Sequence, residues 1–401
     1  MGVGKHIEDY REVVGDEIID RLEEKAEKLE DKHIVNVNST SNGGGVAGLL
    51  LSIVPLMNDL GIDVGWRIHK GSEDFFHVTK SFHNALQGGE INLTDIKKKL
   101  YRQWGEFNSK IDHFEKHDLV VIHDPQPLIR INTRDVNNQK WVWRCHIDME
   151  NPNPVAFNYL KQFIDKYDHV VTTQKIKDIE PPQKEVPPSI DPLNTINKPL
   201  DQKTISKYLH KAGIDRDKPI IAQIGRFDKW KDPLGVIDVW KEANKEIDCK
   251  LILLGNIASD DPEGPEMFEK VKKKAEKYED VTAIAETNEV LVNAIQREAD
   301  VILQKSIKEG FALTVSEALW KETPVIGTHA GGIPLQINDG ENGYLVESNQ
   351  EAAEKVVELI KNPGKRDKMG KKGKEIVREN FLITRQMEDW IDLYNELLNG
   401  E

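Results

Sequence analysis

The chain of 401 residues is long for a single hydrophobic core, so its length predicts two domains of about 150 to 200 residues each. It carries 55 Lys and Arg against 69 Asp and Glu, a net charge of −14, which argues against a broad nucleic-acid-binding surface. Its only cysteines, Cys145 and Cys249, are too few for a disulfide framework or a cysteine-built zinc site. Since there is also no apolar signal core and no apolar run of about 18 residues, we expect a cytoplasmic protein with no membrane segment.

Apolar runs of strand type alternate with helical segments along the first half of the chain. An acidic, helix-like stretch from Glu17 to Leu29 is followed by the candidate strands Ile34–Asn38, Val64–Ile68, Leu119–His123, Val142–Arg144 and His169–Thr172. This alternation predicts βαβ winding around a parallel sheet. The polar, Pro-rich segment from Lys175 to Leu200 interrupts the pattern, so we place a domain boundary there and expect an N-terminal domain of residues 1–195.

A glycine-rich run, Asn42 to Gly45, follows the first candidate strand and precedes a helical pattern from Val46 to Leu56. Glycines at such a point let backbone N–H groups approach a phosphate closely. The run lacks both the Lys-Ser or Lys-Thr of a P-loop and the G-x-G-x-x-G pattern of dinucleotide sites. A simple tight turn is the alternative.

Histidine and aspartate stand at two strand ends, in His123–Pro127 and in Trp143–Asp148. Because alternate residues of a strand share a face, we expect His146 and Asp148 on the same side. Two ligands without a third make a metal site the weaker interpretation. A polar wall for a sugar is the better functional interpretation, and a hydrogen-bonded structural histidine is the alternative.

The second half of the chain repeats the alternation. Its candidate strands are Ile220–Gln223, Lys250–Leu254, Val281–Ala283, Val301–Leu303, Pro324–Gly327 and Gly343–Val346. They predict a second doubly wound, Rossmann-like domain over residues 196–380, and two such domains facing each other would leave a cleft between them. The Lys-rich stretch from Lys361 to Arg378 has helical spacing with acidic neighbours, which favours a solvated helix face over an anion site.

The segment Gly225 to Lys231 leaves the first strand of this second domain. Arg226 could hold phosphate as a planar fork and Lys231 as a point charge, so the loop is a candidate diphosphate site. An exposed charged loop is the alternative.

The segment Glu309 to Glu317 places two carboxylates across a strand-to-helix turn. Ligands collect outside the carboxyl ends of parallel strands, and a following helix offers free N–H groups to an anion. A sugar nucleotide, with its diols and its diphosphate, fits both features. For Glu317 the alternative is a capping box in which Thr314 caps the helix, whereas Glu309 has no such structural explanation.

These residues together resemble the retaining GT-B glycosyltransferases of family 4, in which an E-x7-E segment, here Glu309 and Glu317, marks the donor site. The resemblance is strongest to the trehalose glycosyltransferring synthases and runs from about Tyr10 to the end of the chain. It is carried by residues 36–45, 82–88, 123–127, 143–148, 187–192, 260–264 and 301–317. It implies reversible transfer of glucose, with retained configuration, from a nucleoside diphosphate glucose to C1 of glucose, giving α,α-trehalose.

The resemblance also implies roles for individual residues. Arg226 and Lys231 would hold the diphosphate, Glu309 the glucose hydroxyls and Glu317 the ribose, while His146 would lie near the anomeric carbon. The donor side would further include Gly44, Gly45, Asn288, Val290, Gly310, Phe311, Ala312 and Leu313, and the acceptor side Asn38, Gly48, His83, Asp124, Gln126 and Asp148.

The same resemblance implies further properties of the molecule. The last segment, residues 381–401 with a helix from Thr384 to Leu398, would cross back to the N-terminal domain. No metal and no tightly bound cofactor are implied, and stimulation by Mg²⁺ is left open. The expected partners are sugars and sugar nucleotides, with no nucleic acid and no membrane, and a homodimer is the base-rate expectation.

One residue departs from the family pattern. Where the family has Glu after Gly-Gly-Gly-Val-Ala, this chain has Gly48, so a carboxylate at the helix start is lost. Loss of a hydrogen-bonding group can change which hydroxyl compound a site accepts. Transfer to a polyol or to glycerate, phosphorolysis of trehalose, and a non-enzymatic sugar-nucleotide sensor are therefore the alternatives.

Overall fold

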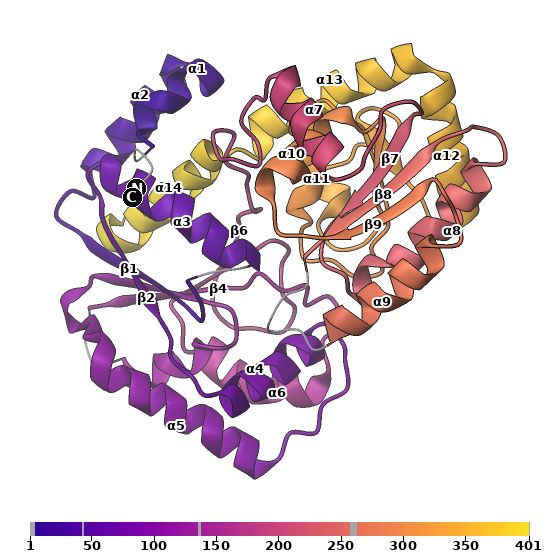
Figure 1. Cartoon of the computed structure of the whole chain (residues 1–401). Helices are drawn as coiled ribbons and strands as arrows, with labels where there is room; N and C mark the ends of the chain where they lie inside the picture. Colours follow the sequence, from indigo (N-terminus) through magenta and orange to yellow (C-terminus); the bar gives the residue numbers. More distant parts are fainter. Residues whose placement is uncertain (1–4, 42–43, 135–137, 257–262, 401) are drawn as a thin grey trace. The chain divides into compact units, whose positions relative to one another are not determined.

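The computed structural model describes residues 5–41, 44–134, 138–256 and 263–400. The chain forms two compact units (Figure 1). The first comprises Met1–Pro188 together with Ile383–Glu401, and the second comprises Ser189–Leu382.

The first unit is built on a six-stranded, all-parallel sheet in the order β2-β1-β3-β4-β5-β6. Its strands are β1 (His33–Asn38), β2 (Asp63–Ile68), β3 (Leu119–His123), β4 (Lys140–Arg144), β5 (His169–Thr172) and β6 (Gln183–Glu185). The strand order reverses between β1 and β3, and the crevice at such a point is where open α/β sheets bind their ligands.

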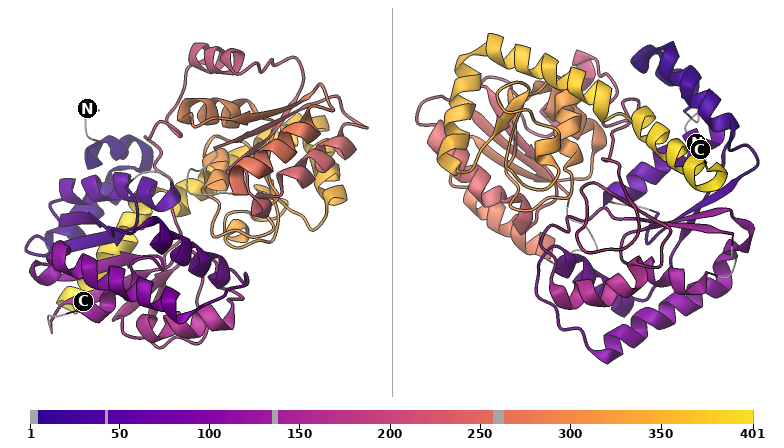
Figure 2. Two further views of the ribbon diagram at one scale, coloured as in Figure 1. Left: turned by 60° about the horizontal axis from the view of Figure 1, so that its bottom comes forward. Right: turned by 180° about the vertical axis from the view of Figure 1, so that it is seen from behind.

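Helices cover both faces of this sheet (Figure 2). They are η1 (Ile7–Tyr10), α1 (Arg11–Val14), α2 (Asp16–Glu27), α3 (Gly44–Asp59), α4 (Glu73–Leu86), α5 (Asp95–Asp112), η2 (Phe114–Lys116), η3 (Leu128–Thr133), α6 (Pro154–Ile164) and α14 (Ile383–Asn399). The C-terminal α14 is held against α2, where Asn395 Nδ2 donates to the carbonyl oxygen of Lys25 over 3.1 Å and Glu388 pairs with Arg21. Because both faces are covered, β3 is buried along its whole length, which explains its continuous apolar sequence.

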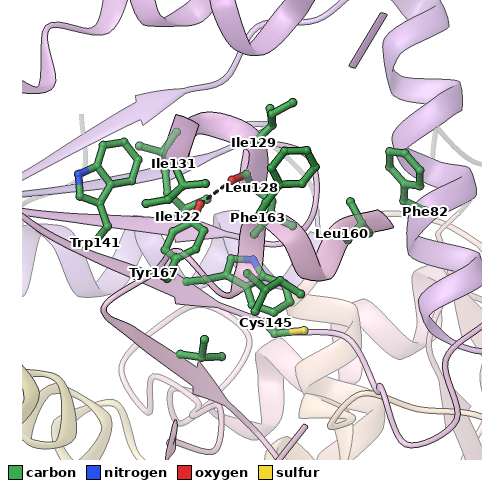
Figure 3. Packing of buried hydrophobic residues seen from close by; sticks show 14 of the residues in the cluster. Phe82, Ile122, Leu128, Ile129, Ile131, Trp141, Cys145, Leu160, Phe163 and Tyr167 are labelled. Atoms are coloured by element: carbon green, nitrogen blue, oxygen red, sulfur yellow. Dashed lines mark hydrogen bonds between the residues drawn. The ribbon is translucent and has the colours of Figure 1, made fainter. Parts of the chain in front are cut away.

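Large aromatic side chains fill the core between the sheet and helices α4 to α6 (Figure 3). Trp141, Phe163 and Tyr167 are all buried there. The hydroxyl of Tyr167 donates to the carbonyl oxygen of Leu128 over 2.7 Å, so its one polar atom is satisfied inside the core (Figure 3). This packing fixes the strands whose carboxyl ends carry the polar residues described below.

The second unit has its own six-stranded parallel sheet in the order β12-β11-β10-β7-β8-β9. Its strands are β7 (Ile220–Ile224), β8 (Lys250–Gly255), β9 (Val281–Ala285), β10 (Val301–Gln304), β11 (Val325–Gly327) and β12 (Gly343–Leu345). Its helices are α7 (Gln202–Lys211), η4 (Lys229–Lys231), α8 (Pro233–Ala243), α9 (Glu263–Ala275), α10 (Glu289–Glu298), α11 (Leu313–Trp320), η5 (Ile333–Leu335), α12 (Asn349–Lys361) and α13 (Pro363–Asn380). The order reverses between β10 and β7, so the loops that follow these two strands meet at one point.

The prediction of two doubly wound, Rossmann-like domains is confirmed, and every predicted strand is present. The two units divide inside the stretch from Lys175 to Leu200 in which the sequence predicts a boundary. The sequence did not predict β6, which residues 183–185 of that stretch form at the edge of the first sheet. The first unit itself ends at Pro188, before the residue 195 expected from sequence. In the part of the chain that the structure describes, no helix is long and apolar enough to cross a bilayer.

Candidate active site

In the second unit, a backbone hydrogen bond connects the loop after β7 to the loop after β10. The backbone N–H of Ile307 donates to the carbonyl oxygen of Trp230 over 2.7 Å. The two loops therefore bring Lys231 to Glu309, and their side chains form an ion pair. Lys231 and Glu309 are 17% and 12% exposed, so the pair is largely withdrawn from water while its outer edge stays accessible.

Glu309 is the centre of a polar cluster at the end of β10. The carboxylate oxygen that pairs with Lys231 also accepts from Ser306 Oγ over 3.1 Å and from Gln304 Nε2 over 3.3 Å. Gln304 and Ser306 are buried, so all three of these contacts converge on a single oxygen of the Glu309 carboxylate, which has a second oxygen that can also accept. The Glu309 carboxylate is thus held in place beside the Lys231 ammonium group.

The backbone of the Lys231 loop is held by aspartate and glutamine side chains. Asp228 is buried, and one of its carboxylate oxygens accepts from the N–H groups of Trp230 and Lys231 over 2.8 and 3.0 Å. Gln223 donates to the carbonyl oxygen of Lys231 over 2.7 Å. Arg226, by contrast, is 47% exposed and lies 3.8 Å from Asp228, so the structure fixes Lys231 and leaves the Arg226 guanidinium facing solvent.

The turn between Glu309 and α11 is held by hydrogen bonds from Gly332 and Gln336. The N–H of Gly332 donates to the carbonyl oxygen of Gly310 over 3.0 Å. Gln336 Nε2 donates to the carbonyl oxygen of Phe311 over 2.5 Å. These contacts hold Ala312 in the left-handed conformation, with φ at 67°, immediately before the helix.

The capping-box interpretation of Glu317 is wrong. Helix α11 starts at Leu313 after the left-handed Ala312, so Thr314 already lies in the first turn and makes no cap. The Glu317 carboxylate instead accepts from Gln296 Nε2 over 3.2 Å. Burial raises the pKa of Glu317 and lowers the pKa of Lys321, one helical turn further on, so each group needs the other or a ligand to remain charged.

In the first unit, two imidazole rings lie at the ends of β3 and β4. His123 Nδ1 is 2.9 Å from His146 Nε2, and His123 Nε2 is 2.9 Å from Asn36 Oδ1 on β1. Burial lowers the pKa of His123 to about 3 and that of His146 well below its usual value, with the positive charge of Arg144 acting in the same direction. Both rings are therefore neutral at pH 7.

Asp124 ties these strand ends together. Its N–H donates to the carbonyl oxygen of Arg144 over 2.9 Å, and its Oδ1 accepts from the N–H of His146 over 2.9 Å. Asp124 adopts a left-handed conformation, with φ at 64°, and burial raises its pKa to about 6. Because β4 ends at Arg144, His146 and Asp148 lie in the following loop, and the strand alternation we expected does not place them.

The remaining predicted residues have varied surroundings. Asn38 uses both amide atoms internally, since Oδ1 accepts from Trp66 Nε1 over 2.8 Å and Nδ2 donates to the carbonyl oxygen of Thr40 over 2.7 Å. Gln126 keeps its buried Oε1 without a partner among the described residues. Asp148 accepts from the N–H of Glu150 over 2.9 Å, and His83 lies half-buried on α4.

The candidates near helix starts differ in accessibility. Gly44 begins α3, and Gly45 and Gly48 are exposed on it, whereas Asn42 and Gly43 lie outside the described residues. Asn288 is the N-cap of α10, where its Oδ1 accepts from the N–H of Leu291 over 3.1 Å, and Val290 is half-buried one position into that helix. Among the residues with described positions, no group of His, Cys, Asp and Glu side chains could hold a metal ion.

Sequence reasoning missed several polar residues that fix the site side chains. They are Asn36, His123 as a partner of His146, Gln296, Gln304, Ser306 and Lys321. A usable signal existed for some of them, because a Gln or Asn inside an otherwise apolar strand run, as at Asn36 and Gln304, needs a buried partner. Gln296 and Lys321 carried no such signal, since Gln296 stands at an ordinary position of α10 and Lys321 directly follows the last residue of α11.

Comparisons with known proteins show which family the chain resembles. Residues 36–177 match the family described as trehalose synthase, N-terminal domain, and residues 205–376 match glycosyl transferases group 1. The chain is 46% identical over 403 residues to a trehalose synthase of Thermococcus litoralis, covering 98% of both chains. It is 27% identical to a trehalose phosphorylase of Pleurotus pulmonarius, covering 84% of this chain and 54% of that protein.

Solved structures with the same fold include a sucrose-phosphate synthase from Thermosynechococcus elongatus. The TM-score is 0.72 at 17% identity, over 92% of this chain and 100% of that chain. An α,α-trehalose 6-phosphate synthase from Burkholderia multivorans matches with a TM-score of 0.71 at 13% identity, over 92% and 98% of the two chains. The predicted GT-B fold is thereby confirmed.

Proposed function

The chain belongs to the trehalose synthase family of glycosyltransferases, and we propose that it transfers glucose from a nucleoside diphosphate glucose to C1 of free glucose. The product is α,α-trehalose, with retention at the donor anomeric carbon. The ion pair between Lys231 and Glu309 at the ends of β7 and β10 carries the proposal, because it sets a cation for phosphate beside a carboxylate for sugar hydroxyls.

The proposed reaction needs no carboxylate nucleophile. The bond between C1 of the donor glucose and the diphosphate oxygen breaks, and a bond from C1 to the acceptor oxygen forms on the same face. The proton of the acceptor hydroxyl moves to the departing diphosphate. Lys231 and Arg226 stabilise the negative charge that develops on that diphosphate, which is the largest demand on the site.

The donor side is assigned by position in the family pattern. Glu309 binds glucose hydroxyls, and the segment Gly310 to Leu313 presents its backbone at the start of α11. Glu317 binds the ribose hydroxyls, and the loop from Asn288 to Val290 accommodates the base. Gly44 and Gly45 lie at the start of α3, where N–H groups can meet a phosphate.

The acceptor side is assigned in the same way. Asn38, His83, Asp124, Gln126 and Asp148 line it, and His146 lies near the donor anomeric carbon. Gly48 leaves open space on this side, since a Cβ atom built there would meet no atom within 4 Å. The molecule is proposed to act in the cytoplasm, as a homodimer, without a tightly bound cofactor and with Mg²⁺ at most as a stimulant.

Product analysis by NMR tests the proposal. The protein is incubated with UDP-, ADP- or GDP-glucose, with and without free glucose. Appearance of α,α-trehalose only when both sugars are present is the expected result. Donor turnover without trehalose would overturn the assigned acceptor and direct the search to polyols and glycerate, while an unchanged donor after long incubation would favour a sugar-nucleotide sensor.

A second candidate is phosphorolysis of trehalose, which the match to the Pleurotus pulmonarius trehalose phosphorylase favours. The two reactions differ in their co-substrate. Breakdown of trehalose that depends on inorganic phosphate would identify phosphorolysis, whereas breakdown that depends on a nucleoside diphosphate is the reverse of the transfer proposed above.

A further inference from the structure

Three side chains, from the interior of β1, the end of β3 and the loop after β4, form a hydrogen-bonded chain in the first unit. It runs from Asn36 Oδ1 through His123 Nε2 and His123 Nδ1 to His146 Nε2, with both contacts at 2.9 Å. The two imidazole rings are nearly parallel, with centroids 5.3 Å apart and an interplanar angle of 15°. The two hydrogen bonds therefore link β1, β3 and the loop after β4, which are neighbours in the sheet.

The chemistry of these atoms determines where each proton is. A side-chain amide oxygen only accepts, so Asn36 Oδ1 requires a proton on His123 Nε2. In a neutral imidazole the other nitrogen then accepts, so His123 Nδ1 requires a proton on His146 Nε2. His146 Nδ1 is then left as a lone pair that can accept a hydrogen bond.

His123 must carry a single proton for this chain to hold, and His146 must carry a single proton for its Nδ1 to remain an acceptor. If His123 gained a second proton, its Nδ1–H would face the Nε2–H of His146, which removes the hydrogen bond. Burial and the positive charge of Arg144 oppose that second proton, since they lower the pKa of both histidines. Arg144 is itself buried, at the end of β4 beside them.

We propose that Asn36 and His123 are positioning residues that hold His146 in its Nε2–H tautomer, so that His146 Nδ1 accepts a hydrogen bond from a sugar hydroxyl. Asn36 and His123 are 5% and 2% exposed and act through His146, which is only half-buried. The assignment of a sugar to this place rests on the proposed function.

The proposal defines what His146 can and cannot do. A bare Nδ1 selects a hydroxyl, which can donate, over a fluorine or a carbonyl oxygen, which cannot. A ring of this tautomer has no acidic proton facing the ligand, so His146 does not protonate the leaving diphosphate. The proton of the acceptor hydroxyl therefore remains the one delivered to the diphosphate.

The tautomer can be measured without any substrate. The full-length protein is labelled with ¹⁵N-histidine, and long-range ¹H–¹⁵N spectra at pH 7.5 identify which ring nitrogen of each histidine is protonated. Spectra of His123→Asn and His146→Gln assign the two signals, and buried His69 of the same unit is the internal control. A protonated Nε2 on both His123 and His146 is expected, and a protonated Nδ1 on His146 would overturn the proposal whatever the enzyme's reaction.

A pair of variants tests the consequence for the reaction. In His123→Asn the amide oxygen can replace Nδ1 as the acceptor for His146, whereas His123→Phe removes that acceptor and keeps a ring. We expect His123→Phe to lose about tenfold or more in kcat at little change in the donor KM, and His123→Asn to recover most of it. Equal losses in both variants would overturn the positioning role.

The His123→Phe variant should also change the His146 spectrum. Because Phe at position 123 offers no acceptor to His146 Nε2–H, the signals of His146 should move toward a mixture of tautomers while those of His69 remain fixed. If His123→Phe does not fold, the wild-type spectrum alone decides the tautomer. A correct tautomer combined with full activity in His146→Gln would leave the hydrogen-bonded chain in place and overturn the assignment of His146 in the proposed function instead.

Discussion

The Lys231 ammonium is the charge that the second unit holds most firmly at its candidate donor site. Asp228 and Gln223 hold the backbone of Lys231, and Glu309 holds its side chain. Replacing Lys231 by Ala should therefore remove a preorganised cation from the diphosphate. We expect a loss of at least about 2 to 3 kcal/mol in transition-state binding, or about 30- to 160-fold in kcat/KM.

The matched control for that variant is Lys245→Ala. Lys245 lies in the same unit, is 63% exposed and pairs with Glu242 at the surface, so its loss should leave kcat/KM unchanged. Steady-state kinetics with the donor as varied substrate measure both variants. Activity of Lys231→Ala within a factor of about two of the parent would remove Lys231 from the site.

At the scale of single residues, the sequence indicated which residues carry suitable functional groups but not which side chains contact one another. The sequence predicts functional roles for Glu309 and Lys231, but it does not show that their side chains form an ion pair. That contact exists because β7 and β10 are neighbours in the sheet. The capping box at Thr314 failed for a related reason. The start of α11 is decided by the left-handed Ala312, and its conformation is maintained by Gly332 and Gln336 from another loop.

At the scale of elements, sequence predicted the strands well because buried parallel strands are short, continuous apolar runs. The missed strand β6 has the sequence Gln-Lys-Glu over residues 183–185 and pairs on only one side. An edge strand of this kind has no apolar signal, since its side chains are not enclosed between two layers. The backbone hydrogen bonds to β5 alone define it.

The loop that supports Glu309 depends on Gly331. Its φ is 51°, and a Cβ at that position would lie 1.6 Å from the carbonyl oxygen of Glu309, so any side chain must displace the backbone at Glu309. Gly331→Ala should lose more than about tenfold in kcat, because a displacement near 1 Å in a site costs up to about 100-fold. It should also lose about 1 to 2 kcal/mol of unfolding free energy from the left-handed conformation alone.

Gly340→Ala is the control that separates strain from displacement. Gly340 also has a positive φ, of 78°, but an added Cβ would meet nothing within 4 Å. It should therefore lose a similar unfolding free energy in urea titrations while keeping its kcat. Equal activity in the two variants would show that the position of the Glu309 backbone does not limit the reaction.

Helix α3 offers a second experiment on an element. Gly48 is exposed on this helix and a Cβ atom there would meet no other atom within 4 Å, so we expect Gly48→Glu to be tolerated. If the carboxylate restores an acceptor contact, kcat/KM for glucose should rise relative to that for polyols. Gly48→Ala is the control, because it gives the same gain in helix propensity, about 1 kcal/mol, without the carboxylate. Identical acceptor profiles in both variants would exclude this position from the acceptor site.

At the scale of the whole molecule, buried neutral histidines link folding to pH. Burial lowers the pKa of His69 and of His123 to about 3 and that of His146 well below its usual value, whereas each would titrate near 6.5 in the unfolded chain. Below pH 6.5 the unfolded chain therefore binds more protons than the folded chain, and stability falls with falling pH. Asp124 acts in the opposite direction between about pH 6 and 4, because burial raises its pKa to about 6. Taken by themselves, these three histidines less this one carboxyl contribute a net slope of about 3 kcal/mol per pH unit in that range.

His69 is the histidine on which this linkage can be tested without touching the candidate site. It is fully buried, its ring centroid lies 5.3 Å from that of Phe75, and its Nδ1 has no partner among the described residues. Its contact to Asn108 is expendable, because Asn108 Nδ2 also donates to the carbonyl oxygens of Lys70 and Trp104. His69→Phe should therefore fold, and between pH 6 and 5 it should lose less stability than the parent, by up to about 1.4 kcal/mol. Urea unfolding at pH 7.5, 6 and 5 measures the difference, and parallel losses in the two proteins would show that His69 is not neutral and buried in the native state.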